Sequence, residues 1–382
     1  MSKDSRWGSS LNILRKLTEF PTYEVSGMRS CAEFLAGELE DLGFSSKLDK
    51  LNSVYAEKTF EDGEGTFLIN THFDTVSSSQ RWVRDPLRAS LEGGRLYGLG
   101  TADAKGGIAA TLYAMARMKN CRFRKLEVLF SNYEDNSITI DGETWLGTPY
   151  FLVHNPLKAD GGINVEGTVK GDKFMVSLGC GGRVGFTVTT LGREAHSSDP
   201  RLGRNAIYDM VKVIEALRRV PPARMTLDDH EAYTELNVSV INGGTAINIV
   251  PGECRIICER RVLPNESWDE VKKEVDQALS TVQGVHVKVE FNKPQRAYLL
   301  DRKHPTVTLA VDSTLKAVGY KPQFRVEAGR TDSTYIDQLA GIKTVILGPG
   351  ETENEHAPDE FINVKRLEEF TEIMYHMLSK PN

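Results

Sequence analysis

Apolar runs typical of buried strands alternate with helix-forming runs in the first third of the chain. Residues 66–71 and 125–131 form the strand-like runs, while residues 27–42 and 108–118 carry apolar side chains at helical spacing. Strands that alternate with helices favour a largely parallel α/β sheet. In such sheets, functional sites lie beyond the carboxyl ends of the strands. We therefore expect a site built from the residues that follow these runs.

The middle of the chain changes this pattern. From Gly182 onward the expected elements follow the order βαββαβ, the ferredoxin-like split arrangement, before the α/β pattern resumes near residue 305. A chain of 382 residues is also too long for one ordinary core. We therefore expect a mixed, largely parallel α/β domain at 1–178 and 294–382, interrupted by an inserted domain at 179–293.

Composition excludes several classes of partner. The net charge of −6 gives no support to a nucleic-acid or anionic-membrane partner, because both call for a basic surface. No apolar run reaches membrane-spanning length, and the start, MSKDSRWGSS, lacks the apolar core of a signal peptide. Five scattered cysteines do not suggest a disulfide framework. We expect a cytoplasmic protein with reduced thiols.

Histidine and carboxylate side chains follow the first strand-like runs. His72 and Asp74 lie two residues apart at the end of LINTHFDTV, so they share a face of the strand and suit a metal ligand with the acid that orients it. The alternative is a capped strand end. Asp103, in the glycine-rich stretch YGLGTADAKGG, is placed to bridge two cations or, equally, to cap the helix that follows.

Three further segments end in acids or a histidine. Glu134 and Asp135 follow the strand-like run LEVLFS and point to different sides, so that one can bind metal while the other handles protons. Glu166 ends another strand-like run, and His356 lies in a polar loop before the last helix. Each residue alone has an ordinary surface explanation. Together, two histidines and three acids suit two zinc-like ions about 3.5–4 Å apart.

These segments resemble the M20 family of metallohydrolases and metallopeptidases, of the acetylornithine deacetylase, succinyl-diaminopimelate desuccinylase and carboxypeptidase G2 type. The resemblance covers nearly the whole chain, through THFDTV, GLGTADAKGG, the acid pair, VEGT and EHAPDEFI. Asp at the second place of the acid pair departs from the family's usual Glu-Glu. The resemblance implies metal ligands, an orienting acid and a general base, which are His72, Asp103, Asp135, Glu166 and His356 as ligands, Asp74 as the orienting acid and Glu134 as the base.

The inserted segment is similar to the family's lid and dimerisation domain. GREAHSSDP implies that His196 reaches a partner subunit's site and polarises the scissile carbonyl, and GGTAINIVPGECRIICERR implies that Asn248 and Arg260 bind a substrate carboxylate. Arg330, in EAGRTDS, either binds a substrate anion or pairs with a nearby acid. The resemblance thus implies a small-molecule substrate, either an N-acyl amino acid or a short peptide, and a homodimer.

The implied activity is removal of an acyl group from an N-acylated amino acid by metal-activated water, with Glu134 as general base. Two divalent ions are expected, zinc first, with cobalt or manganese as alternatives. Three other functions stay open: a dipeptidase or carboxypeptidase of the same family, another C–N hydrolysis such as deamination, and a non-catalytic metal-binding relative.

Overall fold

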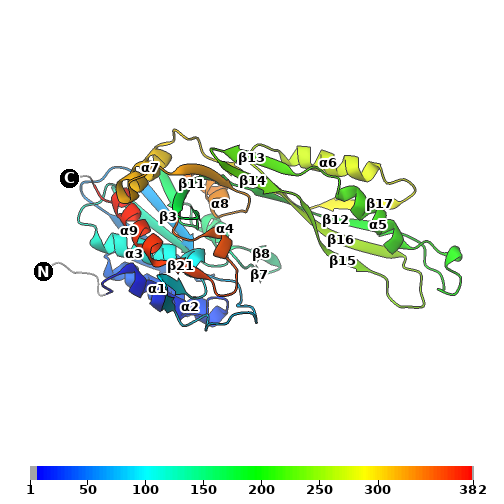
Figure 1. Cartoon of the computed structure of the whole chain (residues 1–382), viewed down its shortest axis with the longest axis horizontal. Coiled ribbons are helices and arrows are strands. Elements are labelled where there is room, and N and C mark those ends of the chain that lie inside the picture. Colours follow the sequence, from blue (N-terminus) through cyan, green and yellow to red (C-terminus); the bar gives the residue numbers. More distant parts are fainter. Residues whose placement is uncertain (1–6, 381–382) are drawn as a thin grey trace. The chain divides into compact units, whose positions relative to one another are not determined.

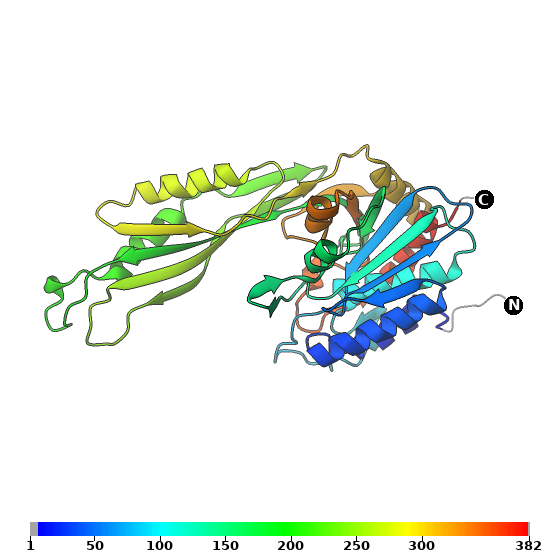
Figure 2. The ribbon, with the colours of Figure 1, turned by 180° about the vertical axis from the view of Figure 1, so that it is seen from behind.

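The computed structural model describes residues 7–380, which divide into two compact units. Unit 1 comprises Met1–Leu178, Leu300–Phe324 and Thr331–Asn382, and unit 2 comprises Gly179–Leu299 and Arg325–Arg330. Among the described residues, none of the helices has the length and apolarity that a membrane crossing requires. Figures 1 and 2 show the two units as ribbons from opposite sides.

Unit 1 is built on a mixed sheet with a parallel centre. The main path of this sheet runs in the order β1-β2-β6-β3-β9-β20-β11-β10. Its strands are β1 (Ser45–Leu48), β2 (Val54–Thr59), β6 (Lys125–Ser131), β3 (Thr66–His72), β9 (Gly161–Asn164), β20 (Thr344–Ile346), β11 (Lys173–Cys180) and β10 (Val169–Lys170). The pairs β6–β3, β3–β9 and β9–β20 are parallel, so their carboxyl ends share one edge.

Helices cover both faces of this sheet, which buries the strands on both sides. The helices of unit 1 are α1 (Ser10–Thr18), α2 (Val25–Asp41), α3 (Gly106–Arg117), α4 (Gly147–His154), α7 (Pro305–Val318), α8 (Ser333–Ala340) and α9 (Val364–Leu378). Figure 2 shows α4 and α8 on one face, with α3 and α9 on the other. Leu68 of β3 and Leu129 of β6 pack with Phe151 of α4 and Ile336 of α8 in a single buried cluster.

Shorter elements complete unit 1 or lie where the chain passes from one unit to the other. They are β4 (Ser90–Glu92), β5 (Arg95–Tyr97), β7 (Ile138–Ile140), β8 (Glu143–Trp145), β18 (Tyr298–Leu299), β19 (Gln323–Glu327), β21 (Phe361–Asn363), the irregular helical turns η1 (Thr101–Lys105) and η3 (Thr352–Asn354). The strand β21 pairs with β5, which immediately precedes the glycine-rich turn. Two distant parts of the sequence therefore meet beside η1.

Unit 2 has the expected ferredoxin-like order of elements. Its elements are β12 (Gly182–Leu191), η2 (Pro200–Leu202), α5 (Ala206–Leu217), β13 (Ala223–Leu227), β14 (His230–Thr234), β15 (Leu236–Gly243), β16 (Glu253–Val262), α6 (Trp268–Ser280) and β17 (His286–Phe291). The antiparallel sheet runs β15-β16-β12-β17, and α5 and α6 pack against it. The β13–β14 hairpin is an addition to that order.

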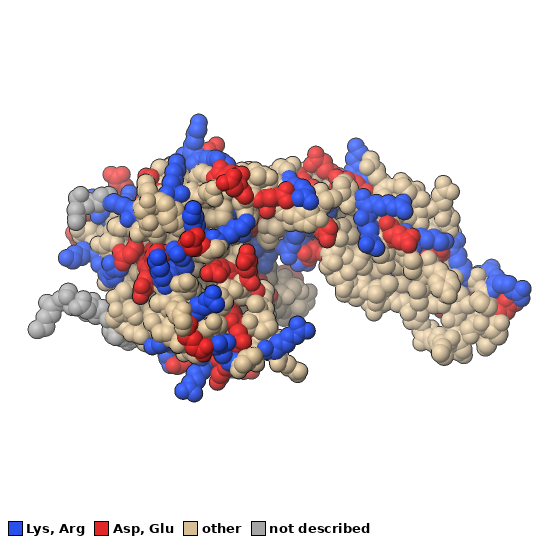
Figure 3. Space-filling view, viewed as in Figure 1, with Lys and Arg blue, Asp and Glu red and all other residues tan. Residues whose placement is uncertain are grey.

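Local sequence explains why these elements form. A capping box at Ser267 and Glu270 starts α6, because each side chain bonds the other residue's backbone N–H. Along β16, exposed and buried residues alternate, so Cys254 and Cys258 face the core as expected for small buried residues on one face. Figure 3 shows Lys and Arg side chains intermingled with Asp and Glu over the visible face of unit 1.

Candidate metal centre

Asp103 lies between the two histidines at the carboxyl edge of the sheet of unit 1. His72 is the last residue of β3, and its Nε2 lies 3.0 Å from Asp103 Oδ1. His356 follows η3, and its Nε2 lies 3.2 Å from the other carboxylate oxygen, Oδ2. One carboxylate therefore offers one oxygen to each imidazole.

The predicted ligands form two clusters that share this carboxylate. One cluster contains His72, Asp103 and Glu166, and the other contains Asp103, Asp135 and His356. Within each cluster the candidate ligand atoms lie within 4.8 Å of one another. A shared carboxylate between two nitrogen and oxygen ligand sets fits a pair of divalent ions.

Asp74 orients both the first histidine and the acid pair. Its fully buried carboxylate accepts the backbone N–H of Glu134 at 2.9 Å, the backbone N–H of Asn136 at 3.2 Å and the Asn136 side-chain amide at 3.0 Å. The Nδ1 atom of His72 lies 3.1 Å from the Asp74 carbonyl oxygen. With Nδ1 held by that carbonyl, Nε2 faces Asp103 and is the atom that would bind a metal ion.

The adjacent acids Glu134 and Asp135 lie in different surroundings. Asp135 Oδ1 is 3.1 Å from His356 Nε2, so Asp135 belongs to the second cluster. The buried side chain of Glu134 belongs to neither cluster, although its backbone is fixed by Asp74. Glu134 is therefore a buried carboxylate next to Asp135 in the chain and outside both ligand clusters.

The carboxylates and imidazoles of the two clusters shift one another's pKa values. Burial raises the pKa of Glu166 to about 7, and burial followed by the charge of Asp103 raises the pKa of Asp135. Burial alone would lower the pKa of His72, but the Asp103 carboxylate raises it above its usual range. Hydrogen bonds to Asp103 and Asp135 raise the pKa of His356 to about 11. These pKa shifts follow from the close approach of the two imidazoles to the carboxylates of both clusters.

Two buried charged residues next to Asp103 were missed by the sequence analysis. Glu360 accepts backbone hydrogen bonds from the glycine-rich turn, and the buried Lys105 donates to the Phe20 carbonyl at 3.1 Å. Burial lowers the pKa of Lys105 to about 8. A sequence signal existed for both, because each lies inside a segment already assigned to the site, GLGTADAKGG or EHAPDEFI.

Unit 2 brings two of its predicted residues together. The backbone N–H of Ser197, next to His196, donates to the Asn248 carbonyl at 3.0 Å, and both His196 and Asn248 are exposed. The backbone N–H of Ser198 donates to His196 Nδ1 at 3.1 Å. A neutral imidazole that accepts at Nδ1 carries its proton on Nε2, so Nε2 is a hydrogen-bond donor.

The predicted substrate-binding role of Arg260 requires correction. Arg260 is 1% exposed, and its guanidinium donates to Glu266 Oε1 at 2.7 Å inside unit 2. Because side chains alternate along β16, the neighbouring Arg261 points to the other face, where its side chain is 34% exposed. The accessible arginines of β16 are therefore Arg255, which is exposed, and Arg261, which is partly exposed. Arg330 is half-buried in the loop after β19.

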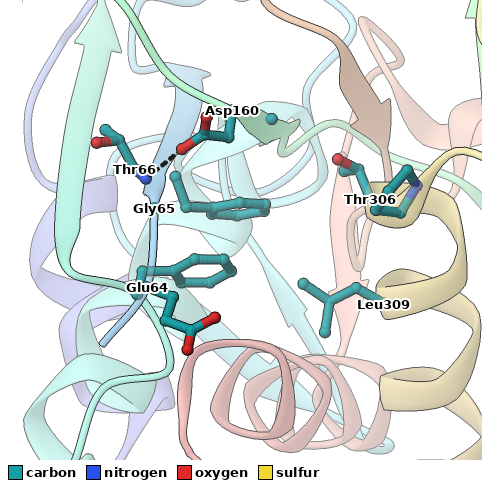
Figure 4. A pocket seen from close by; sticks show the side chains of 10 residues that line it. Glu64, Gly65, Thr66, Asp160, Thr306 and Leu309 are labelled. Carbon is teal, nitrogen blue, oxygen red and sulfur yellow. Dashed lines mark hydrogen bonds between the residues drawn. The ribbon is translucent and has the colours of Figure 1, made fainter. Parts of the chain in front are cut away.

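A separate pocket of about 380 Å³ lies at the opposite, amino-terminal ends of β3 and β9. Figure 4 shows Asp160 directed at the backbone N–H of Thr66, to which it bonds at 2.7 Å, with Thr306 and Leu309 of α7 on the facing wall. The pocket contains none of the predicted site residues.

Comparison with known proteins agrees with the class of protein that the fold and the paired clusters define, a metallohydrolase. The model of peptidase family M20/M25/M40 matches residues 68–380, and the chain belongs to this family. It is therefore a metal-dependent hydrolase that acts on amide bonds.

Relatives with assigned activities include acetylornithine deacetylases. The enzyme of Pasteurella multocida is 28% identical over 385 residues, which span 94% of this chain and 93% of that protein. The enzyme of Pectobacterium carotovorum is 30% identical over 366 residues, which span 90% of this chain and 88% of that protein.

Solved structures share the fold over nearly the whole chain. An M20 family metallo-carboxypeptidase from Sulfolobus solfataricus has a TM-score of 0.77 at 20% identity, covering 96% of this chain and 98% of that chain. Human carnosine dipeptidase 1 has a TM-score of 0.73 at 16% identity, covering 96% and 94%. The expectations for family and fold class are thus confirmed.

Proposed function

We propose that the chain removes the acyl group from an N-acylated amino acid at a two-metal centre. The observation that carries this proposal is the sharing of Asp103 by two ligand clusters, with Glu134 close by and outside both. The similarity to acetylornithine deacetylases over more than nine-tenths of the chain supports deacylation over the other amide hydrolyses.

His72, Asp103 and Glu166 would hold one ion, and Asp103, Asp135 and His356 the other. Imidazole and carboxylate ligands suit zinc, and cobalt or manganese fit the same atoms. When bound, such ions lower the pKa of water and polarise a carbonyl oxygen. Although the side chain of Asp135 is shorter than the glutamate usual in the family, it reaches the second cluster: its Oδ1 lies 3.1 Å from His356 Nε2.

Glu134 acts as the general base in the proposed mechanism. It takes a proton from the attacking water and returns it to the amine that leaves, while Asp74 keeps the segment of Glu134 in place through the 2.9 Å bond to its backbone. His196 donates from Nε2 to the carbonyl oxygen as negative charge develops on it. Asn248 and Arg261 bind the substrate carboxylate, and Arg330 reads a further anionic group.

We propose that unit 2, close to the expected inserted domain at 179–293, is a lid that also forms a homodimer. Its edge strand β15 carries Val240 and Ile241, which are 41% and 54% exposed. Tyr208 and Val211 of α5 are 71% and 49% exposed. An edge strand with exposed apolar side chains favours pairing with a second copy. The five buried free cysteines support a cytoplasmic location.

A panel of substrates tests this function. Purified protein with added zinc is offered acetyl, succinyl and formyl amino acids alongside unmodified dipeptides, and release of the free amino acid is measured. We expect turnover of at least one acyl amino acid at a higher kcat/KM than any dipeptide. Preference for a dipeptide would replace the deacylase with a peptidase, and ammonia release from a non-acylated substrate would indicate deamination.

A further inference from the structure

One buried carboxylate organises the glycine-rich turn that carries Asp103. Glu360 is 3% exposed, and its Oε2 accepts the backbone N–H of Gly100 at 2.8 Å. Its Oε1 accepts the backbone N–H groups of Ala102 at 2.7 Å and of Asp103 itself at 3.1 Å. Three amide groups of a single turn therefore point at one side chain.

The turn needs such a partner because its own backbone is irregular. Gly100 has a φ of 80°, and Asp103 (φ −133°, ψ 94°) is not helical, so a regular hydrogen-bond ladder cannot take up all the N–H groups. A side chain at Gly100 would meet Lys105 Cδ at 2.9 Å, so the turn is also closed on its inner side. Buried amides without acceptors would be costly, and Glu360 supplies the acceptors.

The segment that supplies His356 is also the one that holds Asp103. Four residues after His356, Glu360 bonds the turn through its side chain, and its carbonyl accepts the backbone N–H of Gly98 at 2.9 Å. The next residue, Phe361, pairs with Tyr97 in the β21–β5 ladder. The two elements that meet at the centre are thus fixed to each other by Glu360.

We infer that Glu360 is a positioning residue that sets Asp103 where both ligand clusters can share it. This inference rests on the proposed two-metal function. Glu360 belongs to neither cluster, so it acts through the backbone of the turn and not as a ligand. A glutamine at this position has only one acceptor oxygen, and its amide group would face an N–H donor of the turn.

The test measures metal affinity, not turnover. Metal-free wild type, Glu360→Gln and Glu166→Gln are titrated with Zn²⁺ by calorimetry, with circular dichroism as the check on folding. We expect Glu360→Gln to weaken binding of both ions by about 10–100-fold, the usual cost of losing a partner that orients metal ligands. Glu166→Gln, which removes a ligand of one cluster, should weaken mainly one ion. If Glu360→Gln does not fold, Glu360→Asp, whose shorter side chain cannot reach all three N–H groups, takes its place.

Asp359→Asn provides a matched control. Asp359 is the neighbouring acid, but its Oδ1 accepts the backbone N–H groups of Val83 and Arg84 at 3.2 and 3.0 Å and leaves the turn alone. It should bind both ions as the wild type does. Wild-type affinity in Glu360→Gln, or loss of only one ion, would overturn the inference while leaving the two-metal function intact. A wild type that binds no zinc would overturn both.

Discussion

Glu134 and Asp135 are adjacent in the chain but take separate positions in the centre. Asp135 lies 3.1 Å from His356 and belongs to a ligand cluster, while Glu134 belongs to none. Both acids lie in the bend that follows β6, where the Asp74 carboxylate accepts the backbone N–H of Glu134 at 2.9 Å. The division of roles can therefore be tested one residue at a time.

Glu134→Gln should lower kcat by at least about 10²-fold, the usual scale for a lost general base, because the amide cannot accept the proton from water. Its zinc content should equal that of the wild type, since Glu134 is in neither cluster. Asp135→Ala should instead lose zinc. Metal analysis and steady-state kinetics on both variants provide the measurement, and a loss of zinc in Glu134→Gln with retention in Asp135→Ala would reverse the two roles.

Residue types near strand ends, together with the family resemblance, predicted a set of side chains that would meet. The five predicted ligands came from chain segments up to nearly three hundred residues apart, and the structure brings them into two clusters. The burial of Arg260 and the role of Glu360 could not be predicted, because both depend on tertiary contacts that residue spacing does not reveal. The burial of Arg260 follows from its pairing with Glu266, and the role of Glu360 follows from a turn 257–260 residues earlier in the sequence.

At the scale of elements, the turn between β1 and β2 contains an acid, Asp49, whose ionised form is unfavourable in the folded protein. Asp49 Oδ1 accepts the backbone N–H groups of Leu51 and Ser53 at 2.8 Å each, whereas Oδ2 has no hydrogen-bond partner among residues 7–380. Burial raises the pKa of Asp49 to about 6. The Asp49 carboxyl group therefore binds a proton more tightly in the folded state than in the unfolded state. Ionisation of Asp49 consequently lowers the free energy of unfolding.

Asp49→Asn should stabilise the protein at neutral pH, because asparagine keeps an Oδ1 acceptor and removes the buried charge. With a pKa of 3.8 when unfolded and about 6 when folded, the wild type loses stability as the pH rises through this window. The free energy of unfolding of the variant should exceed that of the wild type by about 1–3 kcal/mol at pH 7, and the difference should vanish below about pH 4. Urea unfolding of the metal-free protein at both pH values measures it. A difference that does not change with pH would contradict this account of Asp49.

Element order was also predictable because hydrophobic periodicity is a local property. The strand expected at 125–131 is β6 (Lys125–Ser131), and the helix expected at 108–118 is α3 (Gly106–Arg117). The β13–β14 hairpin was not predicted, because its first strand follows Pro221 and Pro222 and carries little apolar alternation. Its buried residues Ala223 and Ala232 pack against Leu263 and Val326. Those contacts join distant segments and leave no periodic trace.

At the scale of the whole molecule, the two residues with proposed catalytic roles lie in different units, Glu134 in unit 1 and His196 in unit 2. The proposed homodimer would deliver His196 from one chain to the Glu134 of the other. Glu134→Ala and His196→Ala proteins, each nearly inactive, should then regain activity when mixed under conditions that allow subunit exchange. In a closed two-fold dimer with random exchange, about a quarter of all sites should recover, because half the dimers are mixed and one of their two sites is intact.

Subunit exchange in this experiment is verified with differently tagged chains. If His196 acts within its own chain, the mixture stays as inactive as its parents although exchange has occurred. If His196 has no part in catalysis, the His196→Ala protein alone retains near-normal turnover. Either result would contradict delivery across the dimer.

The central claim is that the clusters around Asp103 hold the ions on which amide hydrolysis depends. The most direct measurement follows hydrolysis of the preferred acyl amino acid by chelator-stripped protein while zinc is added back and bound zinc is counted. Activity should be absent in the stripped protein and should rise to a plateau as the two clusters fill, because the ions supply the activated water. Full activity in protein verified to be free of metal would contradict the claim.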